Sequence, residues 1–167
     1  MRTLVLALAL LPLSLATQAQ TALAQTPTIA PMTEREGWRV IDSDKPYAAM
    51  VDAVKAATTA NQMGVVTEAG PTAAAKALGV TLPGNRVIGV FNPSFAVRVL
   101  PLSTAAMIEA PLRFYVTEDA DGSSTLAWKT PSFVFAPYIA EAGPDLAAIA
   151  AELDAKLEAI ATAATAD

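Results

Sequence analysis

Three side chains that can bind an anion are predicted to lie together on one face of a β-hairpin. Arg113 and Tyr115 alternate along its first strand, and Lys129 belongs to its second. Counting outward from the turn at residues 119–122 places Arg113 opposite Lys129. Two cations beside a phenol form a candidate site for a carboxylate or another small anion. Two other interpretations stay open: a solvated face whose long side chains splay apart, and an inter-subunit salt bridge.

Asn92 is a second candidate ligand-binding residue. In the string Asn92-Pro93-Ser94 it follows an apolar strand, and the C-terminal ends of strands are common ligand sites in open α/β sheets. The alternative is a capping turn in which Asn92 or Ser94 satisfies the first N–H groups of a helix. The residue types favour the cap and leave a ligand-binding role as the alternative.

The chain contains neither histidine nor cysteine. Their absence excludes Ser-His-Asp and Cys-His catalysis, ordinary zinc sites, and haem held by His or Cys within a single chain. Met50, Met63 and Met107 are soft enough to bind Cu(I), but Met50 lies on an apolar helix face and Met63 at the end of that helix, which indicates core packing. We predict no catalytic residue, no metal and no cofactor, and a binding or assembly role in preference to an enzymatic one. The alternative is an enzyme or carrier that acts on a small anionic ligand through the hairpin face.

Residues 1–24 have the pattern of a secretory signal peptide. Arg2 precedes the apolar run 4–15, and small side chains precede a cleavage site after Ala24 or, alternatively, after Ala19. The apolar run is shorter than the about 20 residues that a membrane-spanning helix needs. We therefore expect a periplasmic or secreted protein that does not stay inserted in a membrane. Residues 25–36 contain two prolines and no periodicity, which predicts a flexible tether.

The charge of the chain excludes one class of partner. The formal net charge of −5 becomes −6 once residues 1–24 are removed, because they contain Arg2 and no acid. Binding to nucleic acid needs clustered Lys and Arg, whereas the eleven basic residues here are scattered along the chain. We predict no nucleic-acid partner.

The hairpin itself, residues 111–130, has the clearest secondary-structure pattern in the chain. Its central residues 119–122, Asp-Ala-Asp-Gly, have the composition of a type I turn followed by a left-handed glycine. The register that follows from this turn places Val116 opposite Leu126 and Phe114 opposite Trp128. One face of the hairpin then collects the apolar side chains of Leu112, Phe114, Val116, Leu126 and Trp128. Such alternation indicates that this face is buried.

The remaining elements place this hairpin in an α+β fold. The patterns predict strands at 37–41, 65–67 and 86–91, a helix at about 46–61, short helices at 73–78 and 93–99, and a long helix after residue 144. The predicted order is β-α-β-(α)-β-α-β-β-α. This order favours a two-layer sandwich, with helices on one face of a mostly antiparallel sheet of four or five strands. Residues 37–167 are expected to form a single domain.

Phe133, Phe135 and Tyr138 form an aromatic run after the hairpin. Pro131 and Pro137 interrupt this segment, which excludes a central strand, so it packs as an irregular lid or pairs with another chain. If exposed, the run is an interface for a homodimer or for a small apolar ligand; if buried, it closes the core. Both interpretations stay open, and a homodimer is the predicted assembly.

The order of these elements and several short strings resemble the domain-of-unknown-function 302 family, whose fold is also called TT-1751-like. The likeness rests on residues 63–68 (MGVVTE), 74–82, 87–93 and 111–122, and it covers about residues 37–161. The resemblance implies a small α+β domain, often dimeric, to which no reaction is assigned. Many members have a histidine after the acidic residue that follows the second strand, whereas this chain has Glu68-Ala69-Gly70 there. A metal or cofactor role that depends on that histidine is therefore not expected.

Overall fold

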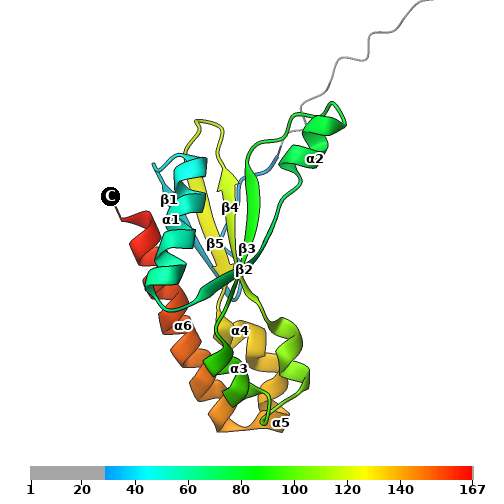
Figure 1. Ribbon diagram of the computed structural model, residues 1–167, viewed down its shortest axis with the longest axis vertical. Coiled ribbons are helices and arrows are strands. Elements are labelled where there is room, and N and C mark those ends of the chain that lie inside the picture. Colours follow the sequence, from blue (N-terminus) through cyan, green and yellow to red (C-terminus); the bar gives the residue numbers. More distant parts are fainter. Residues whose placement is uncertain (1–28, 167) are drawn as a thin grey trace, which may run out of the picture.

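The computed structural model describes residues 29–166, which form a twisted sheet covered by helices (Figure 1). The predicted signal peptide and the first part of the predicted tether, residues 25–28, lie outside the described residues. The strands are β1 (Trp38–Ser43), β2 (Gly64–Ala69), β3 (Asn85–Phe91), β4 (Leu112–Glu118) and β5 (Ser124–Lys129). The helices are α1 (Tyr47–Ala60), α2 (Thr72–Ala77), α3 (Pro93–Val99), α4 (Pro131–Phe135), α5 (Ile139–Ala142) and α6 (Pro144–Thr165), with short 3-10 helices η1 (Ala105–Glu109) and η2 (Ala136–Tyr138).

The five strands form one sheet in the order β1-β5-β4-β3-β2. Every neighbouring pair is antiparallel, and β2 contains an irregularity between Val65 and Thr67. The hairpin of β4 and β5 lies at the centre of this sheet and has the predicted register, because Phe114 is opposite Trp128. The α+β fold class is confirmed.

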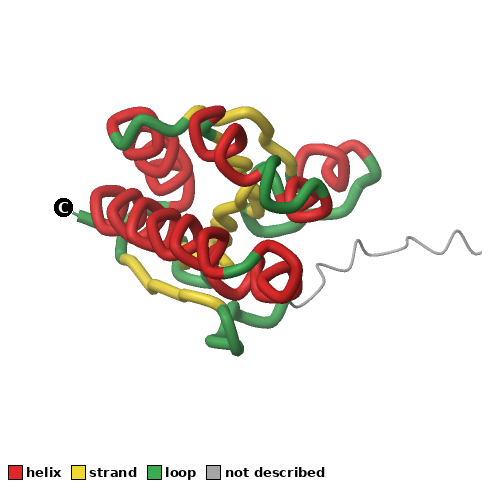
Figure 2. Tube along the Cα trace, turned by 90° about the horizontal axis from the view of Figure 1, so that it is seen from below, coloured by secondary structure: helices red, strands yellow, loops and turns green. Residues whose placement is uncertain are grey.

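Helices cover one face of the sheet, which we call the inner face. The apolar side of the hairpin points to this face, where the rings of Phe114 and Trp128 pack at 5.6 Å between centroids. Helices α1 and α6 lie side by side over it, as the end-on view in Figure 2 shows. The two helices follow the predicted 3.6-residue period, and α6 buries the stripe Leu146, Ile149, Leu153, Leu157 and Ile160.

The segment after the hairpin is helical, which differs from the irregular lid that the sequence predicts. Pro131 occupies the first turn of α4, where its missing N–H is not needed, and the hydroxyl of Thr130 accepts a hydrogen bond from the Phe133 N–H. Pro137 lies in the same way in the first turn of η2. The two prolines therefore start short helices; α4 packs against α6, and η2 contacts α4 and α5.

Long-range ion pairs hold the elements together at the surface. Arg98 of α3 donates two hydrogen bonds, of 2.6 and 2.7 Å, to the Glu152 carboxylate of α6. Such a bidentate contact between a guanidinium and a carboxylate is among the stronger side-chain interactions. The Glu68 carboxylate lies 3.0 Å from the Lys55 ammonium and 3.7 Å from the Arg86 guanidinium.

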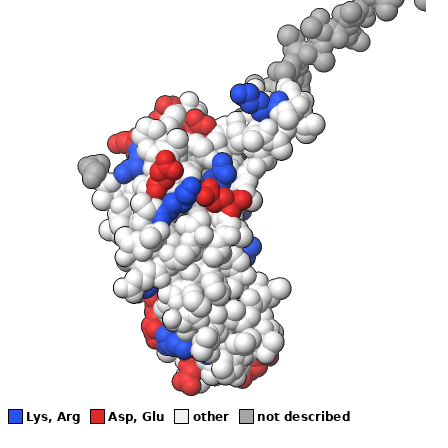
Figure 3. Space-filling model, viewed as in Figure 1, with Lys and Arg blue, Asp and Glu red and all other residues white. Residues whose placement is uncertain are grey.

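The described surface has two general properties that bear on function. No helix within residues 29–166 combines the length and the hydrophobicity needed to cross a membrane. On the face shown in Figure 3, basic and acidic side chains adjoin one another. That face therefore presents no broad basic surface of the kind that binds a phosphate backbone.

Candidate functional site

The outer face of the sheet, opposite the helices, contains a large cleft. Its volume is about 1820 Å³. Side chains of β1, β4 and β5 form its floor, and the hairpin turn, residues 82–85 and residues 29–35 form its sides. The cleft exceeds the roughly 300–1,000 Å³ of a typical small-molecule pocket, so a small ligand would fill part of it.

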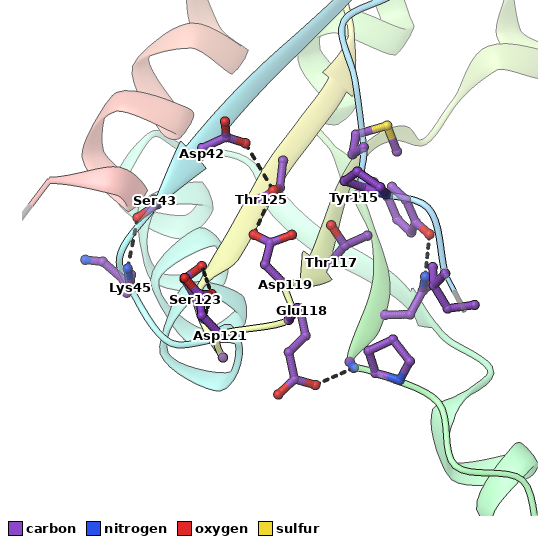
Figure 4. A pocket seen from close by; sticks show the side chains of 18 of the residues that line it. Asp42, Ser43, Lys45, Tyr115, Thr117, Glu118, Asp119, Asp121, Ser123 and Thr125 are labelled. Atoms are coloured by element: carbon purple, nitrogen blue, oxygen red, sulfur yellow. Dashed lines mark hydrogen bonds between the residues drawn. The ribbon is translucent and has the colours of Figure 1, made fainter. Parts of the chain in front are cut away.

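Thr125 lies at the centre of the polar part of the cleft. Its hydroxyl is 2.9 Å from Oδ2 of Asp119 and 3.2 Å from Oδ1 of Asp42 (Figure 4). Thr125 is only 3% exposed, so water has little access to this hydroxyl. Because a hydroxyl has one proton, Thr125 can donate to only one of the two carboxylates at a time. One carboxylate therefore always lacks this donor.

The strand register brings these groups together. Antiparallel pairing places Asp42 of β1 and Thr117 of β4 directly opposite Thr125, one on each side. The Thr117 hydroxyl oxygen is also buried, and it has no hydrogen-bond partner within residues 29–166. The cleft floor thus combines an unused hydroxyl with carboxylates that have acceptor capacity to spare.

The hairpin turn fixes the position of Asp119. The backbone N–H of Asp119 donates to the Ser123 carbonyl at 3.0 Å, and Gly122 takes a positive φ of 87°, which suits glycine. Asp121 Oδ1 accepts hydrogen bonds from the Ser123 hydroxyl and backbone N–H. These bonds lower the pKa of Asp121 below its ordinary value. The turn thus holds two carboxylates at the rim.

The far side of the cleft is built from β3 and β4. The Asn85 amide donates to the Tyr115 hydroxyl, and the backbone N–H of Gly84 donates to Glu118 Oε2 at 2.5 Å. Gly84 has no room for a side chain, because a Cβ there would come within 2.5 Å of the Tyr47 ring. The close contact with Tyr47 keeps this wall in place.

The cleft is predominantly acidic. Its lining includes five carboxylates, from Asp42, Asp44, Glu118, Asp119 and Asp121, and two cations, Arg35 and Lys45. Both cations are engaged elsewhere: the Lys45 ammonium donates to the Ala166 carbonyl at 2.6 Å, and the Arg35 guanidinium lies 5.8 Å from the centre of the Trp38 ring. The ion pairs found among residues 29–166 include none of these carboxylates. An acidic surface of this kind attracts cations.

Of the three residues predicted on the hairpin face, only Tyr115 lines the cleft. The ladder between β4 and β5 ends at Phe114 and Trp128, one residue before the expected pair of Arg113 and Lys129. Arg113 instead lies opposite Gly89 of β3. Lys129 lies opposite Trp38 of β1, with its ammonium 5.5 Å from the centre of that ring. Both cations are exposed, and the structure does not bring them to the cleft.

Asn92 caps helix α3. Its Oδ1 accepts a hydrogen bond of 2.8 Å from the Ser94 N–H, and its amide donates to the Gln62 carbonyl at 2.7 Å. Both ends of the side chain are therefore used in local structure. This geometry matches the capping alternative for Asn92.

The aromatic run is divided among three environments. Phe135 is 5% exposed and belongs to the core, so it is not available to a partner. Phe133 is 41% exposed, and its ring lies where a side chain of Gly37 would be. The Tyr138 hydroxyl donates to Glu109 at 2.8 Å, and this hydrogen bond raises the pKa of Tyr138. The run therefore forms no continuous aromatic surface within the described part of the chain.

The methionines belong to the inner layer. Met50 is fully buried, and Met63 and Met107 line a small apolar cavity of about 40 Å³ beside α3 and Leu153. This placement agrees with the predicted role of these methionines in core packing. Within residues 29–166, no three His, Cys, Asp or Glu side chains are grouped so that they could hold a metal ion.

Sequence reasoning missed the central residues of the cleft for two reasons. Asp42 lies just before α1, where a carboxylate commonly caps a helix, and Asp119 belongs to the hairpin turn, so each has a local explanation that does not point to a cleft. The alternation along β5 predicts that the Thr125 side chain lies on the outer face of the hairpin. It does not indicate which side chains Thr125 contacts there. The pairing of β1 with β5, which brings Asp42 to Thr125, joins strands more than 80 residues apart, and no local pattern indicates it.

With the fold and the cleft described, comparison with known proteins identifies the family. The model of the family "Domain of unknown function DUF302" matches residues 40–164. The chain belongs to the DUF302 family. Its fold is similar to the crystal structure of an uncharacterized conserved DUF302 protein from Bacillus stearothermophilus, with a TM-score of 0.67 and 18% sequence identity. The likeness covers 77% of this chain and 98% of that one. No curated protein matches the chain.

Proposed function

We propose that this DUF302 protein is an exported, non-enzymatic binding module whose outer-face cleft takes a small organic cation, such as an amine or a guanidine. The observation that carries the proposal is the arrangement at Thr125. One buried hydroxyl serves two carboxylates, Asp42 and Asp119, and no cation of the described chain pairs with either of them.

The chemistry of the cleft selects the ligand class. Each carboxylate has about four acceptor positions and no donor, whereas an ammonium or guanidinium group has several donors and no acceptor. A bound cation would satisfy the carboxylate that Thr125 leaves without a proton, and hydrogen bonds between charged groups are stronger than neutral ones. Tyr115 adds an aromatic surface at the wall of the cleft, which also favours a cation.

The alternative ligand is a small anion held by Arg113, Tyr115 and Lys129. It has less support, because the Tyr115 hydroxyl is engaged by Asn85 and the two cations lie outside the cleft. An anion in the cleft itself would meet five carboxylates, and their repulsion would oppose its binding.

Thermal unfolding in the presence of charged probes tests the proposal. Agmatine and spermidine should raise the melting temperature of the purified protein, since a ligand at 100 times its Kd stabilises by about 2.7 kcal/mol. The substitutions Asp42→Asn and Asp119→Asn together should abolish this effect. Asp52→Asn, an exposed position on α1 away from the cleft, is the matched control and should leave it unchanged.

Succinate serves as the anionic probe in the same experiment. Stabilisation by succinate and not by the two amines would overturn the cation assignment. Amine stabilisation that persists in the Asp42→Asn/Asp119→Asn variant would show that the cations bind elsewhere.

Export and assembly are separate parts of the proposal. Export is supported by the pattern of residues 1–24, and fractionation that recovers the protein uncleaved in the cytoplasm would contradict it. A homodimer is supported by the family resemblance alone. Phe135, one of the predicted interface residues, is buried and therefore unavailable to a partner. Sedimentation that shows a monomer at all concentrations would remove the dimer from the proposal.

A further inference from the structure

Residues 29–36, which precede β1, form one side of the cleft, and we call them the strap. The cleft lining includes Ile29, Ala30, Pro31, Met32 and Arg35 of this segment. In Figure 4 the blue chain that leads into β1 passes beside Tyr115. The segment that the sequence predicts to be a tether therefore lies along the proposed binding site.

The C-terminal end of the strap is firmly attached. The Gly37 carbonyl accepts hydrogen bonds from the Thr130 N–H at 2.8 Å and from the Thr130 hydroxyl at 3.3 Å. Gly37 has a positive φ of 74°, and the Phe133 ring fills the space where a Cβ would lie. The Trp38 N–H donates to the Arg35 carbonyl at 3.0 Å, which closes a tight turn. The backbone at Gly37 is thus fixed in place.

The remainder of the strap is held much more weakly. No hydrogen bond or ion pair joins residues 29–34 to any other described residue. Ile29 is 50% exposed, and Met32 is half-buried against the cleft. Segments with few buried contacts and no backbone hydrogen bonds open at low free-energy cost.

We propose that residues 29–34 act as a lid that hinges where they join the fixed turn of residues 35–38 and that controls access to the cleft. The lid closes over the floor through the apolar side chain of Met32, and it opens without breaking a hydrogen bond to the described chain. This inference rests on the proposed function of the cleft and adds a means of regulating the exchange of its ligand.

The absence of cysteine from the chain allows a direct test. In the mature protein, Thr117→Cys places one thiol at the buried hydroxyl position on the cleft floor. The probe is 2-(trimethylammonium)ethyl methanethiosulfonate, and intact mass gives its rate of reaction. Adding Met32→Asp, which puts a negative charge into a cleft lined by five carboxylates, should raise this rate about tenfold by opening the lid. Met32→Leu keeps the apolar contact and should leave the rate unchanged.

Two further variants keep the test decisive. A thiol at the exposed position Ser94 of α3 should react at the same rate with and without Met32→Asp, which excludes general unfolding as the cause. If Thr117→Cys does not fold, Tyr115→Cys serves as the reporter in the cleft. Equal rates at the cleft thiol with Met32 and with Met32→Asp would overturn the lid.

The charge of the reagent allows the lid and the preference of the cleft for cations to be tested separately. The anionic 2-sulfonatoethyl methanethiosulfonate should react with the cleft thiol more slowly than the cationic reagent. A faster anionic reaction would overturn the cation assignment of the cleft and leave the result for the lid intact.

Discussion

Replacing Thr125 by valine removes the hydroxyl that donates to Asp42 and Asp119 while keeping the shape of the side chain. The hydroxyl is nearly fully buried, and the shorter of its two hydrogen bonds, 2.9 Å, goes to Asp119. With a single proton, only one of these bonds contributes at any moment. The variant therefore loses one charge-assisted bond and leaves both carboxylates without the Thr125 donor.

The expected cost follows from the position of the bond. A hydrogen bond to a charged group contributes about 1.5–3 kcal/mol, and the partly exposed Asp119 recovers some of this from water, so we expect Thr125→Val to cost about 1–2 kcal/mol and to lower the Tm by roughly 3–8 °C. Thr117, directly opposite on β4, is the matched control. Its hydroxyl has no partner within residues 29–166, so Thr117→Val should be neutral or stabilising by up to about 1 kcal/mol.

Urea unfolding followed by the fluorescence of the two tryptophans measures both effects. The Thr125→Val/Asp119→Asn double variant should lose less than the sum of the single variants, because the two residues share one bond. Equal losses for Thr125→Val and Thr117→Val would refute the reasoning, since the two hydroxyls differ in their partners. A Thr125→Val variant as stable as the wild type would show that the bond is not formed in solution.

Two further predictions concern the fold itself. A Cβ at Gly89 would lie 2.1 Å from the Thr67 hydroxyl, so Gly89→Ala should cost about 1–3 kcal/mol in thermal unfolding. Gly64→Ala, in the neighbouring strand, meets only contacts of 3.5 Å or more and should cost nothing; equal effects would contradict the steric argument. The hydrogen bond from Arg98 lowers the pKa of Glu152, so this pair stabilises the fold above the ordinary carboxyl pKa, and the contribution is lost as the pH falls through the lowered pKa. Glu152→Gln should therefore be less stable than the wild type at pH 7, and this difference should shrink as the pH falls below the ordinary carboxyl pKa, measured by urea unfolding, whereas a constant difference would argue against the ion pair.

Local sequence patterns were enough to predict the strands, the helices outside the segment after the hairpin, and the central hairpin itself. The turn at residues 119–122 fixes the register of β4 and β5, and the alternation of residues such as Phe114 and Trp128 decides which face is buried. These features depend on residues close together in the chain, where the two-residue period of strands and the 3.6-residue period of helices are directly visible. The same is true of Asn92, whose capping role follows from its neighbours.

Contacts between residues far apart in the chain could not be predicted from these local patterns. Register counting beyond the turn placed Arg113 opposite Lys129, but at the end of the hairpin each strand continues with its outer neighbour, β3 or β1. Glu152 pairs with Arg98, 54 residues away in the chain, because the packing of α3 on α6 brings the guanidinium within reach. Phe135 is buried because helix α4 turns it toward α6.

The sequence by itself therefore determined the α+β class, the hairpin, its apolar face and the absence of His and Cys chemistry. Only the tertiary structure decided where the polar site lies. The pairing of β1 with β5 brings Asp42 to Thr125, and the path of residues 29–36 places Met32 along the same cleft. The physical reason is that such contacts join segments far apart in the chain, and they are set by the packing of the whole sheet instead of by any local period.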